Sequence, residues 1–267
     1  MSTIGGSDQI TVIPHLDRAI FAANPKPYFG YSDNTNLLHF LYGSGVVSYH
    51  GGSILVHLGR SGRLHPAHEE SLRAALFTDD WYDLAEPSEW GDEPVPWSEP
   101  DRFGEEPAMW PHEPWQWDNA DRVLEGQSWG GNIEIVSWLL QAGRVPASEE
   151  FPADGIGFFE TSEEMPPDEE IYRTLRNMGE RGLLQRFAGI IWSRPKAWER
   201  DRRNNAEQKR EYIEAQYAAV RRALAEYSPA ATLVLGVDIG HADPQLIVPY
   251  GGSIRIDGPA RRISVHY

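Results

Sequence analysis

The chain has 267 residues, of which 40% are hydrophobic and 24% charged, the composition of a soluble globular protein of one large domain or two small ones. Its formal net charge of −16 argues against nucleic acid or an anionic membrane as a general partner, since both require a positive surface. The absence of cysteine excludes disulfides, thiolate zinc sites and cysteine nucleophiles, and fits a reducing compartment.

The start of the chain, MSTIGGSDQI, lacks the basic residues and the apolar stretch of a signal peptide. No apolar run reaches the ~18 residues that a membrane-spanning helix needs. We therefore expect a soluble protein of the cytoplasm.

The first of three compositional zones, residues 1–77, contains the short strand-like runs PYFGY and GSILVHL. Between them, NLLHFLYG has leucines at helical spacing and a glycine at its end. This pattern predicts a helix that begins after Ser32 and ends near Gly43.

The second zone, residues 78–128, is dense in proline, acidic residues and tryptophan and has no sustained period. The prolines exclude a long helix or a central strand. Disordered linkers are poor in aromatic residues, whereas the tryptophans here need a surface to pack on. We interpret the zone as a long ordered loop, and loops of this length often carry function.

The third zone, residues 129–267, alternates between the two kinds of element. The runs GIGFFE, FAGIIWS, ATLVLGVDIG and QLIVPYG predict strands, and PPDEEIYRTLRNMGERG and NNAEQKREYIEAQYAAVRRALAEYS predict helices. The first of these helices has proline at its start, acidic residues in its first turn and Gly182 near its end. Alternating strands and helices predict an α/β fold with a mostly parallel sheet and flanking helices.

Ser32 stands at the corner between a strand-like run and a helix, as the serine of a nucleophile elbow does. Gly30 supplies the small residue two positions before it, but Asn34 occupies the place of the second glycine in the G-x-S-x-G pattern. The alternative is that Ser32 caps the helix that follows. The local sequence leaves both interpretations open.

A serine nucleophile needs a histidine to accept its proton and an acid to orient that histidine. His241 follows an apolar strand directly, and Glu160 closes the strand GIGFFE. Residues just beyond the carboxyl ends of such strands line the ligand crevice of an open α/β sheet. Taken alone, Glu160 can equally be a solvated strand end and His241 a turn residue.

Four blocks occur in a recognisable order: the N-terminal segment from IGG to GYSDNT, then WGGNIEIVSWLL, GIGFFETSEE and VDIGHADPQLIVPYGG. Together they resemble the LD-carboxypeptidase family of serine peptidases, which includes the microcin C immunity proteins. The resemblance implies a partial, amidotransferase-like N-terminal domain with the nucleophile (1–77), a Trp/Pro-rich connecting loop (78–128) and a C-terminal LD-carboxypeptidase domain (129–267).

The resemblance also implies the roles of particular residues. Ser32 is then the nucleophile, His241 the general base and acid, and Glu160 the orienting carboxylate. The backbone N–H groups of Asp33 and Gly6 are expected to form the oxyanion hole, and the residues expected to contact substrate are Gly5, Trp90, Trp97 and Asn132. No metal or organic cofactor is implied, and a homodimer is expected.

The tryptophan-rich zone resembles the microcin C immunity branch, in which aromatic residues of a long loop stack on the substrate's nucleotide. Trp90 and Trp97 are the candidates for such stacking, although each is as readily explained by packing of the loop onto the body. The substrate is therefore expected to be a muropeptide or a peptidyl-nucleotide.

Members of the family begin with a strand-and-helix segment upstream of the IGG turn, and the present sequence shows none. Two interpretations are open: an enzyme whose start lies further upstream, or a truncated, non-catalytic member that acts as a binding or scaffold protein.

Overall fold

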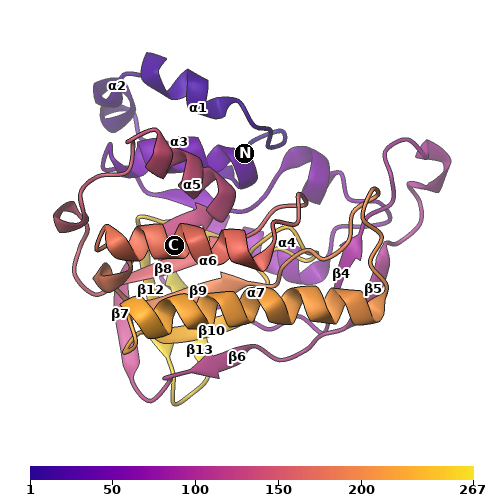
Figure 1. Ribbon diagram of the computed structural model, residues 1–267. Helices are drawn as coiled ribbons and strands as arrows, with labels where there is room; N and C mark the ends of the chain where they lie inside the picture. Colours follow the sequence, from indigo (N-terminus) through magenta and orange to yellow (C-terminus); the bar gives the residue numbers. More distant parts are fainter.

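The computed structural model describes residues 1–267, and its centre is an eight-stranded sheet of order β3-β13-β12-β7-β8-β9-β10-β6 (Figure 1). Four adjacent strands of this sheet are parallel: β7 (Val123–Asn132), β8 (Gly155–Glu160), β9 (Phe187–Ser193) and β10 (Thr232–Val237). The α/β prediction is confirmed for this central part, where helices link the strands.

The outer strands of the sheet are antiparallel: β3 (Trp81–Asp83), β13 (Arg262–His266) and β12 (Ser253–Asp257) on one side, and β6 (Gln116–Asp118) on the other. The expectation of a mostly parallel sheet is therefore wrong at the flanks. Strands β12 and β13 are joined by a short turn, which suffices for an antiparallel hairpin but not for a parallel crossover.

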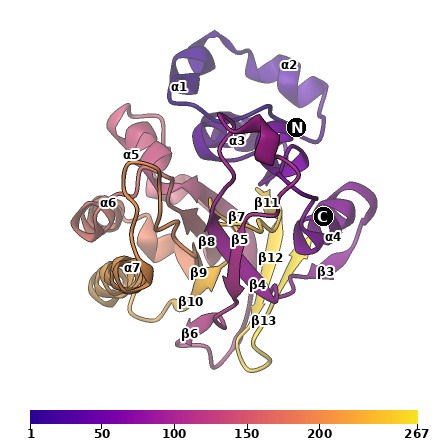
Figure 2. The same ribbon diagram turned by 90° about the vertical axis from the view of Figure 1, so that its right-hand side faces the viewer.

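Three helices follow the parallel strands: α5 (Ile133–Gln141), α6 (Asp168–Glu180) and α7 (Ala206–Tyr227). Helices α6 and α7 pack together on one face of the sheet, and α4 (Pro66–Phe77) lies on the opposite side (Figure 2). Every residue of β8 and β10 is buried, so the core lies between the sheet and these helices. No helix of the chain is both long enough and apolar enough to cross a membrane.

A second, three-stranded sheet combines β1 (Phe29–Gly30) and β2 (Ser48–His50) with β11 (Val248–Tyr250), so the first and third zones share hydrogen-bonded strands. Helix α3 (Thr35–Tyr42) follows β1 after the 3-10 turn η2 (Ser32–Asn34) and ends at Gly43, as predicted. Helices α1 (Gln9–Val12) and α2 (Arg18–Ala23) precede β1. The remaining 3-10 turns are η1 (Ile13–His15), η4 (Pro100–Arg102), η5 (Ser148–Glu150) and η6 (Leu184–Arg186).

The run GSILVHL, predicted as a strand, instead forms the π-helical turn η3 (Ile54–Leu58). The Ser53 hydroxyl accepts a hydrogen bond from the backbone N–H of Val56 and so caps the turn. The N–H groups of Ile54 and Leu55 bond to the extended first residues of the chain. No strand lies beside this run to pair with it, so its β-propensity does not decide its structure.

The zone predicted as a connecting loop, 78–128, contains four short strands and the start of β7. Strands β4 (Glu89–Glu93) and β5 (Ala108–Pro111) form a two-stranded sheet of their own. Strands β3 and β6 join opposite edges of the large sheet. The zone is therefore ordered and crosses from one edge of the sheet to the other.

Candidate active site

Ser32 lies two residues after the end of β1 and has a backbone φ of +59°, in the left-handed region that residues other than glycine rarely adopt. A helix N-cap has extended backbone angles and accepts a hydrogen bond from an N–H two or three residues on. Neither η2 nor α3 has a side-chain cap, so the N-cap interpretation of Ser32 is wrong. Strain of this kind in a polar residue is typical of functional sites.

The contacts of the Asn34 side chain explain why this position is not glycine. Its side-chain amide donates to the carbonyl oxygens of Tyr31 (3.0 Å) and Ile4 (3.3 Å), and its Oδ1 accepts from Tyr28. A β-carbon on Gly30 would stand 2.8 Å from that of Asn34, so this position requires glycine. The Asn34 side chain thus binds the N-terminal segment to the serine corner.

The Gly5-Gly6 turn lies against this corner. A β-carbon on Gly5 would stand 3.0 Å from Ser32 Oγ and 3.5 Å from the backbone nitrogen of Asp33. The Asp33 carboxylate accepts from the backbone N–H of Gln9 (3.0 Å) and so ties α1, just beyond the turn, to the same place. The backbones of Gly5, Gly6 and Asp33 therefore border the serine, and their predicted oxyanion role stays a prediction.

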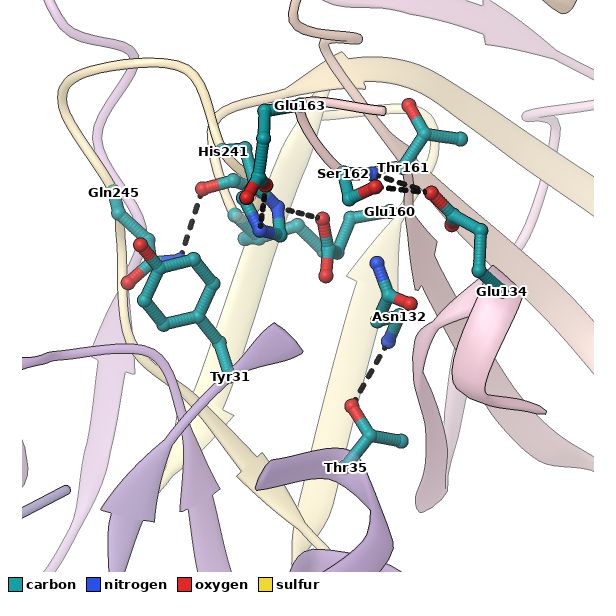
Figure 3. A network of polar contacts seen from close by, with 12 residues as sticks. Tyr31, Thr35, Asn132, Glu134, Glu160, Thr161, Ser162, Glu163, His241 and Gln245 are labelled. Atoms are coloured by element: carbon teal, nitrogen blue, oxygen red, sulfur yellow. Dashed lines mark hydrogen bonds and ion pairs between the residues drawn. The ribbon is translucent and has the colours of Figure 1, made fainter. Parts of the chain in front are cut away.

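The imidazole of His241 lies beside the carboxylate of Glu160, with Nδ1 2.6 Å from Oε2 (Figure 3). Glu160 ends β8 and is fully buried, and His241 lies in the loop after β10. Gly240 permits this approach, because a β-carbon there would stand 3.0 Å from the Glu160 β-carbon and 2.8 Å from Ser193 Oγ. The two residues that the sequence predicts as partners are in contact.

The charges of this pair are mutually stabilised. Burial by itself raises the pKa of Glu160, but the adjacent His241, with a smaller contribution from His50, outweighs it, and the pKa falls below its usual range. Burial likewise disfavours the charged imidazole, yet the carboxylates of Glu160 and Glu163 raise the pKa of His241. The geometry therefore favours a carboxylate paired with an imidazolium.

Asn132 lies behind the acid rather than at the ligand-facing surface. Its side-chain Oδ1 accepts from the backbone N–H of Ile135 at the start of α5. Its backbone N–H donates to Thr35 Oγ1 (Figure 3). The Asn132 amide is buried beside Glu160 and contributes, after His241 and His50, to the lowered pKa of that carboxyl. Asn132 is not among the residues that line the cavity described below, so the direct substrate contact predicted for it is not seen.

A cavity of about 710 Å³ brings the serine corner and the histidine together. Ser32, His241 and the Gly5-Gly6 turn all line it. The cavity is also lined by Trp97, from the segment between β4 and β5, and by Lys196 and Arg200, from the segment between β9 and α7. No hydrogen bond joins Ser32 to His241, whose Nε2 instead lies 3.2 Å from Glu163 Oε2. No cluster of three or more histidine, aspartate or glutamate side chains is arranged to hold a metal ion.

The two candidate tryptophans differ in position. Trp97 is 57% exposed and lines the cavity, so its predicted role in stacking stays a prediction. Trp90 is 7% exposed, packs against Trp110 and lies under the guanidinium of Arg194, 4.9 Å from its ring centre. Trp90 is not among the residues that line the cavity, so the substrate stacking predicted for it is not seen.

Sequence reasoning missed three residues of the site. Tyr31 has its ring centre 4.7 Å from that of His241, Glu163 contacts the imidazole, and Glu134 accepts two hydrogen bonds from Ser162, from N–H (2.9 Å) and Oγ (2.5 Å). Burial, followed by repulsion from Glu160, raises the pKa of Glu134 to about 7. All three lie within one to three residues of a predicted site residue, the one signal that could have found them.

Comparison with known protein families gives two matches along the chain. The LD-carboxypeptidase N-terminal domain matches residues 1–51, and the LD-carboxypeptidase C-terminal domain matches residues 125–256. The matched regions contain Ser32 and the pair of Glu160 and His241, respectively.

Curated relatives cover parts of the chain. It is 34% identical over 102 residues to the microcin C7 self-immunity protein MccF of Escherichia coli, a stretch covering 37% of this chain and 30% of MccF. It is 25% identical over 193 residues to a candidate carboxypeptidase of Vibrio cholerae, covering 72% and 55% of the two chains. The alignments thus span about a third to a half of these relatives' lengths.

Solved structures share the fold. MccF in complex with aspartyl sulfamoyl adenosine superposes with a TM-score of 0.82 at 22% identity, covering 100% of this chain and 75% of that one. An MccF-like protein from Streptococcus pneumoniae in complex with AMP gives a TM-score of 0.79 at 18% identity, covering 98% and 76%. At these identities the likeness establishes the mixed α/β architecture.

Proposed function

Because the chain belongs to the LD-carboxypeptidase family, we propose that it is a serine hydrolase that cleaves an amide or related acyl bond through an acyl-enzyme. One observation carries the proposal. Ser32, in a strained left-handed conformation, lines the same cavity as His241, and the Nδ1 atom of His241 is hydrogen-bonded to the buried carboxylate of Glu160. In serine hydrolases, an acid that orients a histidine beside a serine allows the histidine to take the proton of the serine hydroxyl.

In the proposed reaction, Ser32 Oγ attacks the substrate carbonyl while Nε2 of His241 accepts its proton. Glu160 holds the ring through Nδ1 and stabilises the imidazolium. The proton then passes to the leaving group, and water hydrolyses the acyl-enzyme by the same steps in reverse. The N–H groups of Asp33 and Gly6 are proposed to bind the oxyanion, where one such donor contributes about 3 kcal/mol.

The proposed substrate is a peptidyl-nucleotide or a muropeptide, with a free carboxylate near the scissile bond. The exposed ring of Trp97 at the cavity wall favours a nucleotide, because an indole offers a flat face for a base. Solved MccF structures hold glutamyl sulfamoyl guanosine and aspartyl sulfamoyl adenosine, which is consistent with this preference. A homodimer and a cytoplasmic location are further proposals that rest on the family resemblance.

The alternative is a non-catalytic member that binds ligand in the same cavity. The contact of His241 Nε2 with Glu163 in place of Ser32 favours it. A hydrolysis assay separates the two: purified protein is incubated with a muropeptide tetrapeptide and with aspartyl sulfamoyl adenosine, and products are followed by mass spectrometry. We expect cleavage by the unmodified protein and none by Ser32→Ala. Binding without cleavage of either compound would favour the alternative.

A further inference from the structure

Both ring nitrogens of His241 face carboxylates. Nδ1 lies 2.6 Å from Glu160 Oε2, and Nε2 lies 3.2 Å from Glu163 Oε2 (Figure 3). A neutral imidazole has one N–H and can donate to only one of them. The doubly protonated imidazolium satisfies both contacts, so the arrangement seen corresponds to the charged ring.

This arrangement conflicts with the chemistry of a general base. To take a proton from Ser32, His241 must be neutral and must present a lone pair at Nε2. In the ion pair with Glu163 the ring is charged and Nε2 carries a proton, so it has no lone pair to present. The contact with Glu163 must therefore break before the hydroxyl is activated.

We propose that Glu163 is a positioning residue that holds His241 in a protonated resting form and that must release Nε2 before each catalytic cycle begins. This inference rests on the proposed hydrolase function for its consequence in catalysis, but the contact itself is independent of any substrate.

The placement of Glu163 suits such a reversible contact. Its side chain is 51% exposed, lines the cavity and makes no ion pair or hydrogen bond other than that with His241. Ser162, the residue before it, is anchored to Glu134 by two hydrogen bonds. The side chain of Glu163 can thus turn toward solvent while the backbone that carries it stays in place.

Charged and titratable groups from every packed element surround the imidazole. Glu160 from β8 and Glu134 from α5 are buried carboxylates, and Glu163 belongs to the loop between β8 and α6. His50 from β2 and His57 from η3 add repulsion toward a charged ring, and Tyr31 packs against it with its phenol protonated. Of the three carboxylates, Glu163 alone is substantially exposed, so only its contact breaks without leaving a buried charge unpaired.

The test is a titration of the histidine rings by NMR in the full-length protein without substrate. The His241 signal is assigned by its loss in His241→Asn. In Glu163→Gln, which keeps the side-chain size and removes the charge, we expect the pKa of His241 to fall by about one unit, as removal of an adjacent opposite charge does. The matched control is Glu164→Gln, since Glu164 also lines the cavity but forms no ion pair.

The outcomes separate this inference from the proposed function. A fall in the pKa in Glu163→Gln but not in Glu164→Gln supports it, and an equal pKa in all three proteins overturns it. If Glu163→Gln proves unstable, Glu163→Ala gives the same reading. If the wild type hydrolyses a substrate, the acid limb of its kcat/KM profile should lie about one pH unit lower in Glu163→Gln. At low pH this shift makes kcat/KM of the variant about tenfold higher than that of the wild type. If no substrate is cleaved, the proposed function fails while the titration still decides the role of Glu163.

Discussion

Gly5 leaves room for Ser32 in the wall of the cavity: a β-carbon added to Gly5 would stand 2.9 Å from the β-carbon of Ser32. Backbone from the start of the chain is therefore packed against the proposed nucleophile, and no side chain larger than hydrogen fits between them.

Gly5→Ala should lower kcat by about 10- to 100-fold, because misplacing a nucleophile by about 1 Å costs on this order. The midpoint of thermal unfolding should also fall, because the added β-carbon must displace Ser32 or the segment that carries Gly5. Gly104→Ala is the control, because a β-carbon there meets nothing within 4 Å. Equal kcat values for both variants would show that the turn does not hold Ser32 in place.

Ser32→Ala and Ser32→Gly should both reduce hydrolysis by at least about 10⁴-fold, because each removes the attacking hydroxyl. They should differ in stability. At φ +59°, alanine keeps the left-handed strain and glycine relieves it, so the glycine variant should be about 1 kcal/mol more stable than the alanine variant in urea denaturation. A less stable glycine variant would argue that Ser32 is not strained.

Glu160→Gln should lower kcat by about 10³- to 10⁴-fold, because the imidazolium that forms during proton transfer loses its counter-charge. The stabilising contribution of Glu160, whose pKa is lowered, is lost as pH falls, and that of His241, whose pKa is raised, is lost as pH rises. The destabilisation by Glu160→Gln should therefore be largest between about pH 4.5 and 6.5, the unperturbed values of the two groups. Urea denaturation at several pH values checks this.

Glu134→Gln should stabilise the protein at high pH relative to low pH. A carboxyl group with its pKa raised to about 7 is penalised when it ionises, so its cost is small below pH 5 and complete above pH 7. The glutamine oxygen can still accept from Ser162. The stability of the variant relative to wild type should rise between pH 5 and pH 8 by up to about 2–3 kcal/mol. A constant difference across that range would mean that Glu134 ionises normally.

Trp97→Ala should raise KM for an aminoacyl-nucleotide about tenfold and leave KM for a muropeptide unchanged, since stacking on a base contributes about 1–3 kcal/mol. Trp90→Ala is the matched comparison. Its buried ring should cost about 3–5 kcal/mol of stability when truncated. Equal effects of Trp97→Ala on both substrates would remove the nucleobase assignment.

The positions of Glu160 and His241 could be predicted because each lies at the end of an apolar run, and parallel strands of one sheet deliver their carboxyl ends to the same edge. Ser32 could be proposed from its corner position, but its left-handed backbone and its neighbour Gly5, 27 residues earlier in the chain, could not, because local propensity encodes neither. The contact of Glu163 with His241 could not be foreseen, because it depends on how the loop of residues 161–167 is anchored to Glu134 on helix α5.

The tryptophan-rich zone shows the opposite limit. Its content of proline correctly excluded a long helix, but strands β3 and β6 form there because the edges of a neighbouring sheet supply hydrogen-bond partners. Composition alone also could not distinguish Trp90 from Trp97, which lie seven residues apart, the first buried and the second exposed.

Strands β3 and β6 shield both margins of the large sheet, and the chain between them carries Trp97 to the cavity. The same stretch of polypeptide thus guards the sheet against intermolecular strand pairing and builds the ligand-facing wall. A deletion in this segment could enlarge the cavity for a bulkier ligand. If it removed β3 or β6, however, it would expose the edge of the next strand to intermolecular pairing. Selection on ligand size and selection on solubility therefore act on one segment, which restricts how freely its length can vary.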